Sequence, residues 1–370
     1  MNEYQYYEFR AVDRPLTAQE QAELRKLSTR ATISAYHFSN VYRWGRFKGS
    51  SEAMVERYFD AHLYVAHWGV RRLMLRLPER HFDMQRASSY LEGDRPLLRR
   101  AGDHVILRFE IDETWSDDVQ GEGWLTSLLP LRQELLSGDL RSLYLGWLAR
   151  AALGQLSADD EEPPVPPGLR SLSTALTALV DFLLIPPELL EVAARASAAA
   201  EEPVPREQLE TWLQGLPAPE KDALLLRLID QSGAVPGLAL HRCFQAGQAP
   251  APEQLPPPRR MVGTLLRDAV ALQRDKERQA KERQAAARER ELEALTARGS
   301  AAWEQVDQLF ATRRPTDHAA GVRLLVDLRE IARRQGTEEE FTRRLSQLRE
   351  RNARRAGLIS RMDKEGLSAP

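Results

Sequence analysis

The segment Arg259–Gly299 reads RRMVGTLLRDAVALQRDKERQAKERQAAARERELEALTARG and directly follows a run of three prolines. No glycine or proline interrupts it between Gly263 and Gly299, and from Gln273 to Glu291 its only apolar residues are alanines. The segment therefore predicts one long helix with almost no core of its own. A helix of about forty residues would reach about 60 Å, which suits it to hold something at a distance or to meet a partner.

Charge pairs along this predicted helix can stabilise it although it has almost no apolar residues to bury. Glu277 with Lys281 and Arg278 with Glu282 stand four residues apart, and each such pair stabilises a helix by about 0.2–0.5 kcal/mol. A long parallel coiled coil is disfavoured, because apolar residues cannot fill the a and d positions of three successive heptads here.

The charge of the chain is unevenly spread, although its net value is only -2. From Arg259 onward, 25 Lys and Arg stand against 18 Asp and Glu, a balance of +7, and the preceding residues carry -9. This asymmetry is typical of a nucleic-acid or anionic-surface contact, or of attraction between the two halves. Since the basic residues are interleaved with acids, the pattern favours solvation over DNA binding.

Cysteine usage and hydropathy indicate a reduced, cytoplasmic setting. Cys243 is the single cysteine, so neither a disulfide framework nor a thiolate zinc site is expected. The N-terminal residues lack the basic and apolar regions of a signal peptide. The most apolar stretch, Leu176–Ile185, is too short to span a bilayer and contains Asp181. We expect no membrane contact.

Strand signals concentrate in the aromatic-rich N-terminal part. Residues 4–12 and 105–111 alternate apolar and polar side chains, while 62–65 and 71–77 look like a pair of strands. Thr17 with Glu20 forms a capping box that opens a helix. These signals predict an α+β, mostly α chain whose small N-terminal α/β sandwich is a modified split βαβ unit.

At 370 residues the chain is long enough for two or three domains. Prolines and charge runs mark the predicted boundaries. The expected parts are an α/β domain (1–120), a helical extension (121–156), an acidic proline-rich linker too polar to pack (157–168), a helical bundle (169–247), a proline-rich linker (248–258), the long charged helix (259–299) and a TPR-like helical hairpin (300–370).

The predicted hairpin has its own start and stop signals. Thr316 can cap a helix that stops at Gly336, and Thr337 with Glu340 forms a second capping box. Two helices of this size joined by a Gly-Thr turn form an αα-hairpin, the unit of solenoid repeats. Only one convincing copy is present, so a repeat array is not expected.

Two stretches resemble bacterial proteins. The run from His318 to Leu367 resembles the C-terminal helical region of proteins that carry SWIM-type zinc fingers. The opening, from YEFRAVDRPLT to RYFDAHLYVAHWG, resembles an uncharacterised bacterial family without an established activity. A SWIM finger needs three cysteines and a histidine, so its zinc function does not carry over to this chain. The resemblance implies a helical interaction surface and a bacterial setting.

One cluster interleaves aromatic rings with cations on a glycine-flanked loop. This composition stacks nucleic-acid bases or anchors a protein partner. We expect Arg71 and Arg72 to lie near the loop if the strands pair as predicted. The alternative is that Trp44 and Phe47 cover the core of their own domain and that the cations are solvated. The candidate contacts are Tyr42, Arg43, Trp44, Arg46, Phe47, Lys48, Arg71 and Arg72.

Carboxylates at the end of a predicted strand form a second candidate site. Glu110, Asp112 and Glu113 could hold Mg²⁺ or act as acid and base. A solvated strand terminus is favoured, because acids are mostly exposed. The sequence lacks the glycine-rich motifs of nucleotide-binding proteins and the nucleophile elbow of α/β-hydrolases. We expect no cofactor and no catalytic or metal residue.

These observations lead us to expect a non-enzymatic adaptor or scaffold in a bacterial multiprotein system. It would bind a protein partner through its aromatic N-terminal domain and its C-terminal helices. The first alternative is a nucleic-acid-binding accessory protein that uses the Arg43–Lys48 loop and the basic C-terminal helices. The second is an enzyme with a carboxylate site near Glu110–Asp118.

Overall fold

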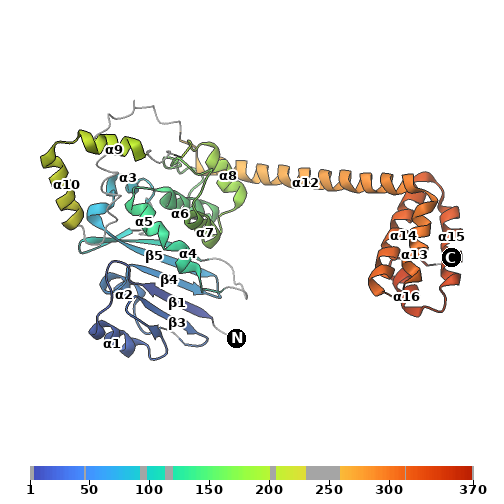
Figure 1. Cartoon of the computed structure of the whole chain (residues 1–370), viewed down its shortest axis with the longest axis horizontal. Coiled ribbons are helices and arrows are strands. Elements are labelled where there is room, and N and C mark those ends of the chain that lie inside the picture. The colour runs from blue at the N-terminus through green and yellow to red at the C-terminus, as the bar shows by residue number, and fades with distance from the viewer. Residues whose placement is uncertain are drawn as a thin grey trace. The chain divides into compact units, whose positions relative to one another are not determined.

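A computed structural model describes residues 4–45, 47–91, 98–112, 120–200, 206–230, 259–312 and 314–368. Helices make up 57% and strands 14% of it, which confirms the predicted α+β, mostly α class. The chain forms two compact units, Met1–Gln273 (unit 1) and Arg274–Pro370 (unit 2). Figure 1 shows the chain with its helices and strands labelled where there is room.

Unit 1 is built on a seven-stranded sheet in the order β2-β3-β1-β4-β5-β7-β6. The pairings recorded among the described strands are antiparallel. The strands are β1 (Gln5–Arg10), β2 (Thr32–Ile33), β3 (His37–Tyr42), β4 (Ala61–Ala66), β5 (Val70–Pro78), β6 (Leu98–Ala101) and β7 (His104–Asp112).

A split βαβ unit organises the first half of this sheet. β1 lies between β3 and β4 and is antiparallel to both, so β3 and β4 run in the same direction. The helix α2 (Ser51–Arg57) connects them, and the Ser50 side chain accepts a hydrogen bond that caps its first turn. The helix α1 (Ala18–Leu27) begins at the predicted capping box of Thr17 and Glu20. The predicted capping box therefore places the start of α1 correctly.

The two faces of the sheet pack against different helices. One face, with Leu63, Leu73 and Phe109, joins the largest core together with the helices after the sheet. The other face packs Phe9 and Phe38 against α1 and α2. Before α12, the described part of unit 1 also contains a short 3-10 helix η1 (Glu79–His81), α3 (Met84–Ser88), α4 (Trp124–Leu128), α5 (Pro130–Leu136), α6 (Arg141–Ala152), α7 (Thr174–Phe182), α8 (Pro187–Arg195), α9 (Arg206–Gly215) and α10 (Ala218–Asp230).

The acidic segment 157–168 packs into unit 1, whereas we expected it to be too polar to pack. Glu162 is only 2% exposed. It accepts hydrogen bonds from the Tyr144 hydroxyl at 2.5 Å and from Arg260 Nε at 2.6 Å. Next to it, Glu161 forms a β-bridge with Met261. The carboxylate is buried because two donors satisfy it there. The second predicted linker, 248–258, lies outside the described residues.

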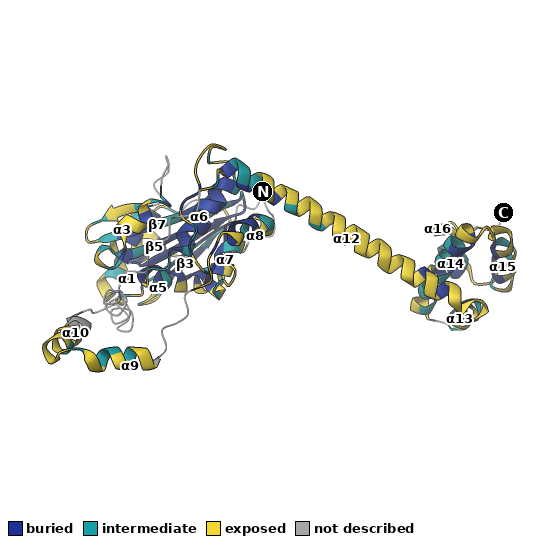
Figure 2. Ribbon diagram, turned by 90° about the horizontal axis from the view of Figure 1, so that it is seen from above, coloured by how far each residue is buried: buried dark blue, intermediate teal, exposed yellow. Residues whose placement is uncertain are grey.

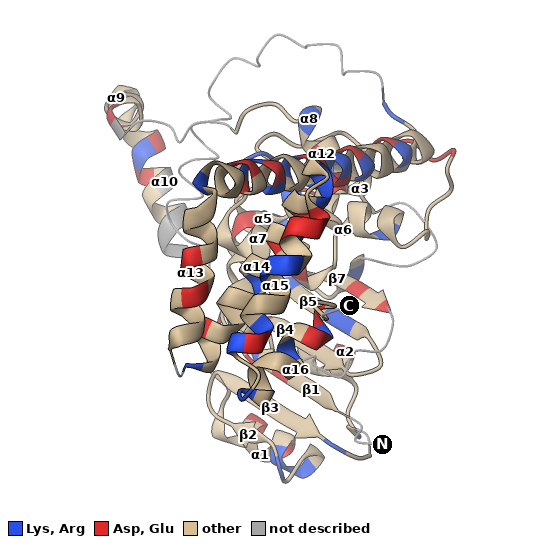
Figure 3. Cartoon of the chain, turned by 90° about the vertical axis from the view of Figure 1, so that its right-hand side faces the viewer, with Lys and Arg blue, Asp and Glu red and all other residues tan. Residues whose placement is uncertain are grey.

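The predicted long helix is α12 (Val262–Arg298). Its first turns contribute Val262 and Leu265 to the core of unit 1, and its last turns contribute Leu292 and Leu295 to the core of unit 2. Every residue in 277–291 is exposed, which Figure 2 shows as a yellow stretch. Figure 3 shows acidic and basic residues side by side along this helix. The expectation of a solvated middle is confirmed.

Unit 2 continues with α13 (Ser300–Ala311), α14 (Pro315–Gln335), α15 (Glu338–Arg351) and α16 (Ala356–Lys364). α14 and α15 form the expected hairpin, and Gly336 ends α14 in the left-handed conformation that glycine favours. The expected cap at Thr316 was wrong, because α14 starts at Pro315 with Arg314 at its N-cap. Thr337 is the N-cap of α15 as expected, but its side chain makes no capping hydrogen bond within the described structure, so the predicted capping box is not formed. The core also includes α13 and α16, so unit 2 is a bundle larger than a hairpin.

Candidate functional site

The base of the aromatic loop after β3 is fixed to the sheet. The half-buried Phe47 ring lies 5.2 Å from the Tyr7 ring, 6.0 Å from Phe38 and 6.4 Å from Tyr42, measured between centroids. Gln5 donates a hydrogen bond from its side-chain amide to the Gly45 carbonyl at 2.9 Å. The alternative interpretation is therefore correct for Phe47, which covers the core of its own domain.

The side chain of Gln5 also binds the hydroxyl groups of two tyrosines. Its Oε1 accepts hydrogen bonds from Tyr7 at 3.1 Å and from Tyr64 at 3.4 Å. Burial of the Tyr64 ring, together with the neighbouring Tyr7, raises the pKa of its hydroxyl above the ordinary value. The Tyr64 hydroxyl therefore stays protonated at neutral pH and serves as a donor. Gln5 joins the loop to β1 and β4 through one buried amide.

The tip of the loop points into solvent. Trp44 is 66% exposed, the largest exposure among the large apolar side chains of the described structure. Arg43 and Lys48 are exposed as well. The Arg30 guanidinium lies 5.8 Å from the Trp44 ring centroid, a cation–π contact worth about 0.5–1 kcal/mol at such a site. The sequence did not identify Arg30, because the strands β2 and β3 separate it from Trp44 in the chain. Arg46 lies outside the described residues.

Arg71 does not join this site. Arg71 and Arg72 are adjacent on β5, so their side chains lie on opposite faces of the sheet. Arg71 donates to the backbone carbonyls of Asp181 and Phe182, at 3.3 Å each, and thereby holds the end of α7. Burial lowers the pKa of Arg71. The expectation that it lies near the aromatic loop is wrong.

Arg72 lies on the same face as the loop but is already paired. The strand register places it between Tyr64 and Glu110 in one row across the sheet. Its Nε lies 2.7 Å from Glu110 Oε2, and its guanidinium lies 5.8 Å from the Tyr64 ring centroid. A second carboxylate, that of Glu52, is 3.8 Å away. These contacts commit Arg72 to the sheet surface rather than to a ligand.

The predicted carboxylate site is neutralised in the same row. Glu110 pairs with Arg72 and, at 3.6 Å, with Arg108. Asp112 is exposed at the end of β7, opposite Val70. Glu113 lies outside the described residues. Within the described ranges, no three His, Cys, Asp or Glu side chains gather in a way that could hold a metal ion.

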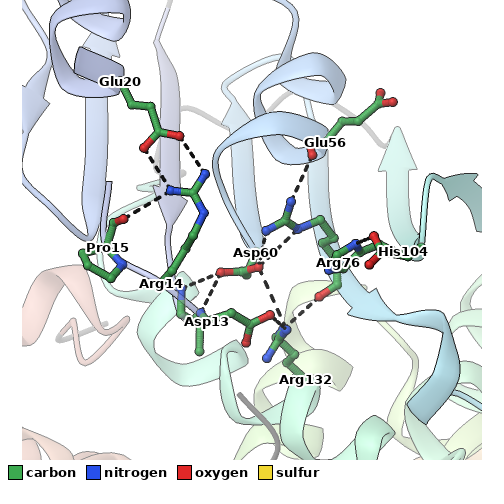
Figure 4. Close-up of polar contacts among 11 residues, drawn as sticks. Asp13, Arg14, Pro15, Glu20, Glu56, Asp60, Arg76, His104 and Arg132 are labelled. Carbon is green, nitrogen blue, oxygen red and sulfur yellow. Dashed lines mark hydrogen bonds and ion pairs between the residues drawn. The ribbon is translucent and has the colours of Figure 1, made fainter. Parts of the chain in front are cut away.

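A buried ion-pair cluster, which the sequence did not reveal, lies at the other end of the sheet (Figure 4). Asp60 is 1% exposed. Its Oδ1 accepts hydrogen bonds from Arg76, the shorter at 2.7 Å, and its Oδ2 accepts the backbone N–H groups of Val12 at 2.6 Å and Asp13 at 2.9 Å. Arg132, from α5, donates to Asp13 Oδ2 at 2.6 Å and to the Arg76 carbonyl at 2.8 Å.

The pKa shifts and hydrogen bonds of this cluster indicate that it stabilises the fold. Burial disfavours the charged form of Asp60, yet Arg76 and the two backbone donors hold its pKa below the ordinary value. For Asp13 burial dominates, and its pKa is raised despite Arg132. Both Asp60 oxygens are occupied by hydrogen bonds. The cluster ties the loop after β1 to β5 and α5.

Comparisons with family models, with curated proteins and with solved structures give no match to this chain. Among the described helices, none combines the length and the apolar character that a bilayer span requires.

Proposed function

We propose that this chain is a non-enzymatic adaptor that binds a protein partner through the tip of the Trp44 loop in unit 1. The observation that carries the proposal is the 66% exposure of Trp44 on a loop whose base is fixed by Phe47 and Gln5. Keeping a large ring in water is unfavourable, and tryptophan and arginine dominate the residues that contribute most to protein interfaces.

The order of the loop base lowers the entropic cost of such a contact. Because Gly45 and Phe47 are held by the sheet, little backbone has to be immobilised when a partner covers Trp44. Arg30 stacks on the same ring and adds a charge to the contact surface. Arg43 and Lys48, which are close to Trp44 in the sequence, are also exposed. The surface therefore suits a partner that presents an apolar recess with acidic groups around it.

α12 supports the adaptor proposal in a second way. One helix supplies buried side chains to both cores, Leu265 to unit 1 and Leu295 to unit 2. The residues between its ends are exposed and carry pairs such as Arg278 with Asp275 at 3.0 Å and with Glu282 at 3.9 Å. A continuous helix is stiffer than a glycine- or proline-rich linker of the same length. We propose that it serves as the connector between two binding units.

Affinity capture with matched variants tests the proposal. The full chain, its Trp44→Ala variant and its Tyr36→Ala variant are immobilised and exposed to lysate of the native host. Tyr36 is the control because it is a second exposed aromatic residue of unit 1, at 53%. The proposal expects a stoichiometric protein that Trp44→Ala loses and Tyr36→Ala retains. A captured set that is the same for all three proteins contradicts it.

The same experiment separates a protein partner from nucleic acid, since exposed Trp and Arg side chains also stack on bases. One half of each sample is treated with nuclease, and the salt concentration is varied. Retention that survives nuclease and changes little with salt supports the adaptor. Retention that vanishes with nuclease and falls steeply with salt would replace it by nucleic-acid binding.

A further inference from the structure

Arginines from three parts of unit 2 meet at the turn between α13 and α14. Arg314 lies in this turn, directly before Pro315, and is exposed. Arg361 of α16 donates a hydrogen bond to the Pro315 carbonyl at 2.7 Å. Arg355, which directly precedes α16, donates one to the Phe310 carbonyl near the end of α13. The two carbonyls flank the turn, so the three arginines lie around it.

The charges of these arginines are not cancelled by carboxylates. With the exposed neighbour of Arg355 in the chain, the arginine patch consists of Arg314, Arg354, Arg355 and Arg361. Among the described residues, no ion pair with an acid is recorded for these four, whereas Arg349 of the same unit pairs with Asp363 at 2.7 Å. A backbone carbonyl carries no net charge. The bonds of Arg355 and Arg361 therefore hold the guanidinium groups in place and leave their positive charge intact.

Acidic residues in the neighbouring turns are fewer than the arginines. Asp307 of α13 pairs with Arg351 at 3.5 Å. Asp317 is half-buried in the first turn of α14, where a carboxylate stabilises the helix, and the Thr316 hydroxyl donates to it. Glu350, in the last turn of α15, is exposed. With Arg351 included, five arginines stand against three acids, so this end of unit 2 is positively charged.

Helix stability does not explain two of the arginines. Arg314 and Arg355 are the N-cap residues of α14 and α16, and neither side chain makes a capping hydrogen bond. N-caps favour Ser, Thr, Asp and Asn, and the helix dipole disfavours a cation at this end. Residues that depart from local preferences without a gain in stability are expected at binding surfaces.

The surroundings of the arginine patch favour a nucleic-acid backbone over a protein as its partner. Protein interfaces depend on buried apolar anchors, but none of the exposed large apolar side chains of the described structure belongs to unit 2. A nucleic-acid backbone needs no such anchor, because its phosphates bind through charge. The planar guanidinium also matches a phosphate group with two parallel hydrogen bonds.

We propose that the arginine patch binds the phosphate backbone of a nucleic-acid duplex without reading its sequence. Arg355 and Arg361 present guanidinium groups that the turn already holds, and Arg314 and Arg354 add exposed charges beside them. This inference goes beyond the adaptor function. It gives unit 2 a partner of a different chemical class from the protein proposed for the Trp44 loop.

Fluorescence anisotropy of a short labelled DNA duplex of mixed sequence, titrated with the full chain at several salt concentrations, tests the inference. A duplex RNA of the same sequence is the second probe. The Kd should rise about tenfold or more for Arg314→Gln/Arg354→Gln, because each lost contact is a hydrogen bond between charged groups. The slope of log Kd against log salt should fall by about 2, since each phosphate contact contributes about 0.9.

Arg298→Gln/Arg333→Gln is the matched control, because it removes the same charge from two exposed arginines of unit 2. Arg298 directly precedes the start of α13 and Arg333 lies in the last turn of α14, so both are at the opposite ends of these helices from the patch. The control should leave the Kd and the salt slope nearly unchanged. Circular dichroism verifies that each variant is folded. If the double patch variant is not, Arg354→Gln alone replaces it, with Arg333→Gln as its control.

Polyglutamate at an equal concentration of charges should displace the duplex poorly. Three results would overturn the inference. They are no binding of either duplex at low salt, equal Kd values for the patch and control variants, and displacement by polyglutamate as efficient as by unlabelled duplex, which would assign the patch to an acidic protein.

The arginine patch and the Trp44 loop can fail independently. Trp44→Ala should not change the Kd for the duplex, because Trp44 belongs to unit 1. Arg314→Gln/Arg354→Gln should not change the capture of a protein that depends on Trp44. If Trp44→Ala weakens duplex binding and the patch variant does not, the nucleic-acid site is not in unit 2.

Discussion

The Asp60 cluster and the Trp44 loop belong to the same unit and combine charges with packing in opposite ways. Asp60 is 1% exposed and both of its oxygens accept hydrogen bonds from Arg76 and from backbone N–H groups. Trp44 is 66% exposed, and among the described residues the cation recorded over its ring is Arg30. The satisfied hydrogen bonds of Asp60 stabilise the interior of the unit, whereas the exposed ring of Trp44 on a fixed base is the surface that we propose for partner binding. The difference in exposure, rather than in residue type, distinguishes the two regions.

The largest effect is expected for Asp60→Ala, which leaves Arg76 buried without its carboxylate. Breaking a buried ion pair in this way costs about 3–5 kcal/mol. Chemical denaturation of the full chain, followed in unit 1, measures the loss. Asp103→Ala is the control, because the Asp103 side chain is 92% exposed and its loss should cost less than about 0.5 kcal/mol. Equal unfolding free energies for the two variants would show that the cluster is not a structural clamp.

His62 should make the stability of the interior depend on pH. It is fully buried against Phe9, with ring centroids 4.0 Å apart, and burial lowers its pKa to about 3 from 6.5. Between these two pKa values the histidine binds a proton in the unfolded chain but not in the folded chain. The free energy of unfolding therefore falls as the pH drops from about 6.5 toward 3. The slope approaches about 1.4 kcal/mol per pH unit.

Urea unfolding of wild type and His62→Gln between pH 7 and 4 isolates this contribution. The difference between them should shrink as the pH falls, since only the wild type carries the penalty. His104→Gln is the matched control on the same sheet, where the ring is 24% exposed. A constant difference between wild type and His62→Gln across this range would contradict the assignment.

Phe47→Ala tests whether the base of the loop contributes both to the stability of unit 1 and to partner binding. Only part of the ring is buried, so its loss should cost about 1–2 kcal/mol. It should also weaken partner capture, because Trp44 loses its fixed support. Phe47→Leu retains an apolar group and should preserve both properties. If Phe47→Ala leaves capture intact, the ordered base is not needed for recognition.

Trp44→Ala should have the smallest effect on stability, within about 0.5 kcal/mol in a thermal melt, because the ring packs on little besides Arg30. Its effect on partner binding should be the largest of the series, about tenfold or more in Kd. If Trp44→Ala loses stability but still binds its partner, Trp44 belongs to the structural core and not to the binding surface.

Local patterns in the sequence predicted much of the framework. The Thr17 capping box, the pairing of 62–65 with 71–77 and the stop at Gly336 all appear in the structure. Each depends on a few neighbouring residues, so a short window contains its cause. The exposed middle of α12 belongs to the same class, because a segment without apolar positions cannot be buried.

Other features depend on residues far apart in the chain. The Asp60 cluster unites positions 13, 60, 76 and 132, and nothing local marks them as partners. Arg30 and Trp44 meet because β2 and β3, which lie between them in the chain, pair as an antiparallel hairpin. The burial of Glu162 required Tyr144 and Arg260 to be brought to it by the fold. By contrast, the separation of Arg71 from Arg72 was available from sequence, since neighbours on a strand point to opposite faces.

The most direct test of the adaptor proposal is photo-crosslinking from the loop tip in the native host. Trp44 is replaced by a photoreactive phenylalanine derivative, and the same residue is placed at Tyr36 as the control. We expect one protein adduct of defined mass from position 44 and none in common with position 36. No protein adduct from position 44, or the same adducts from both positions, would contradict it.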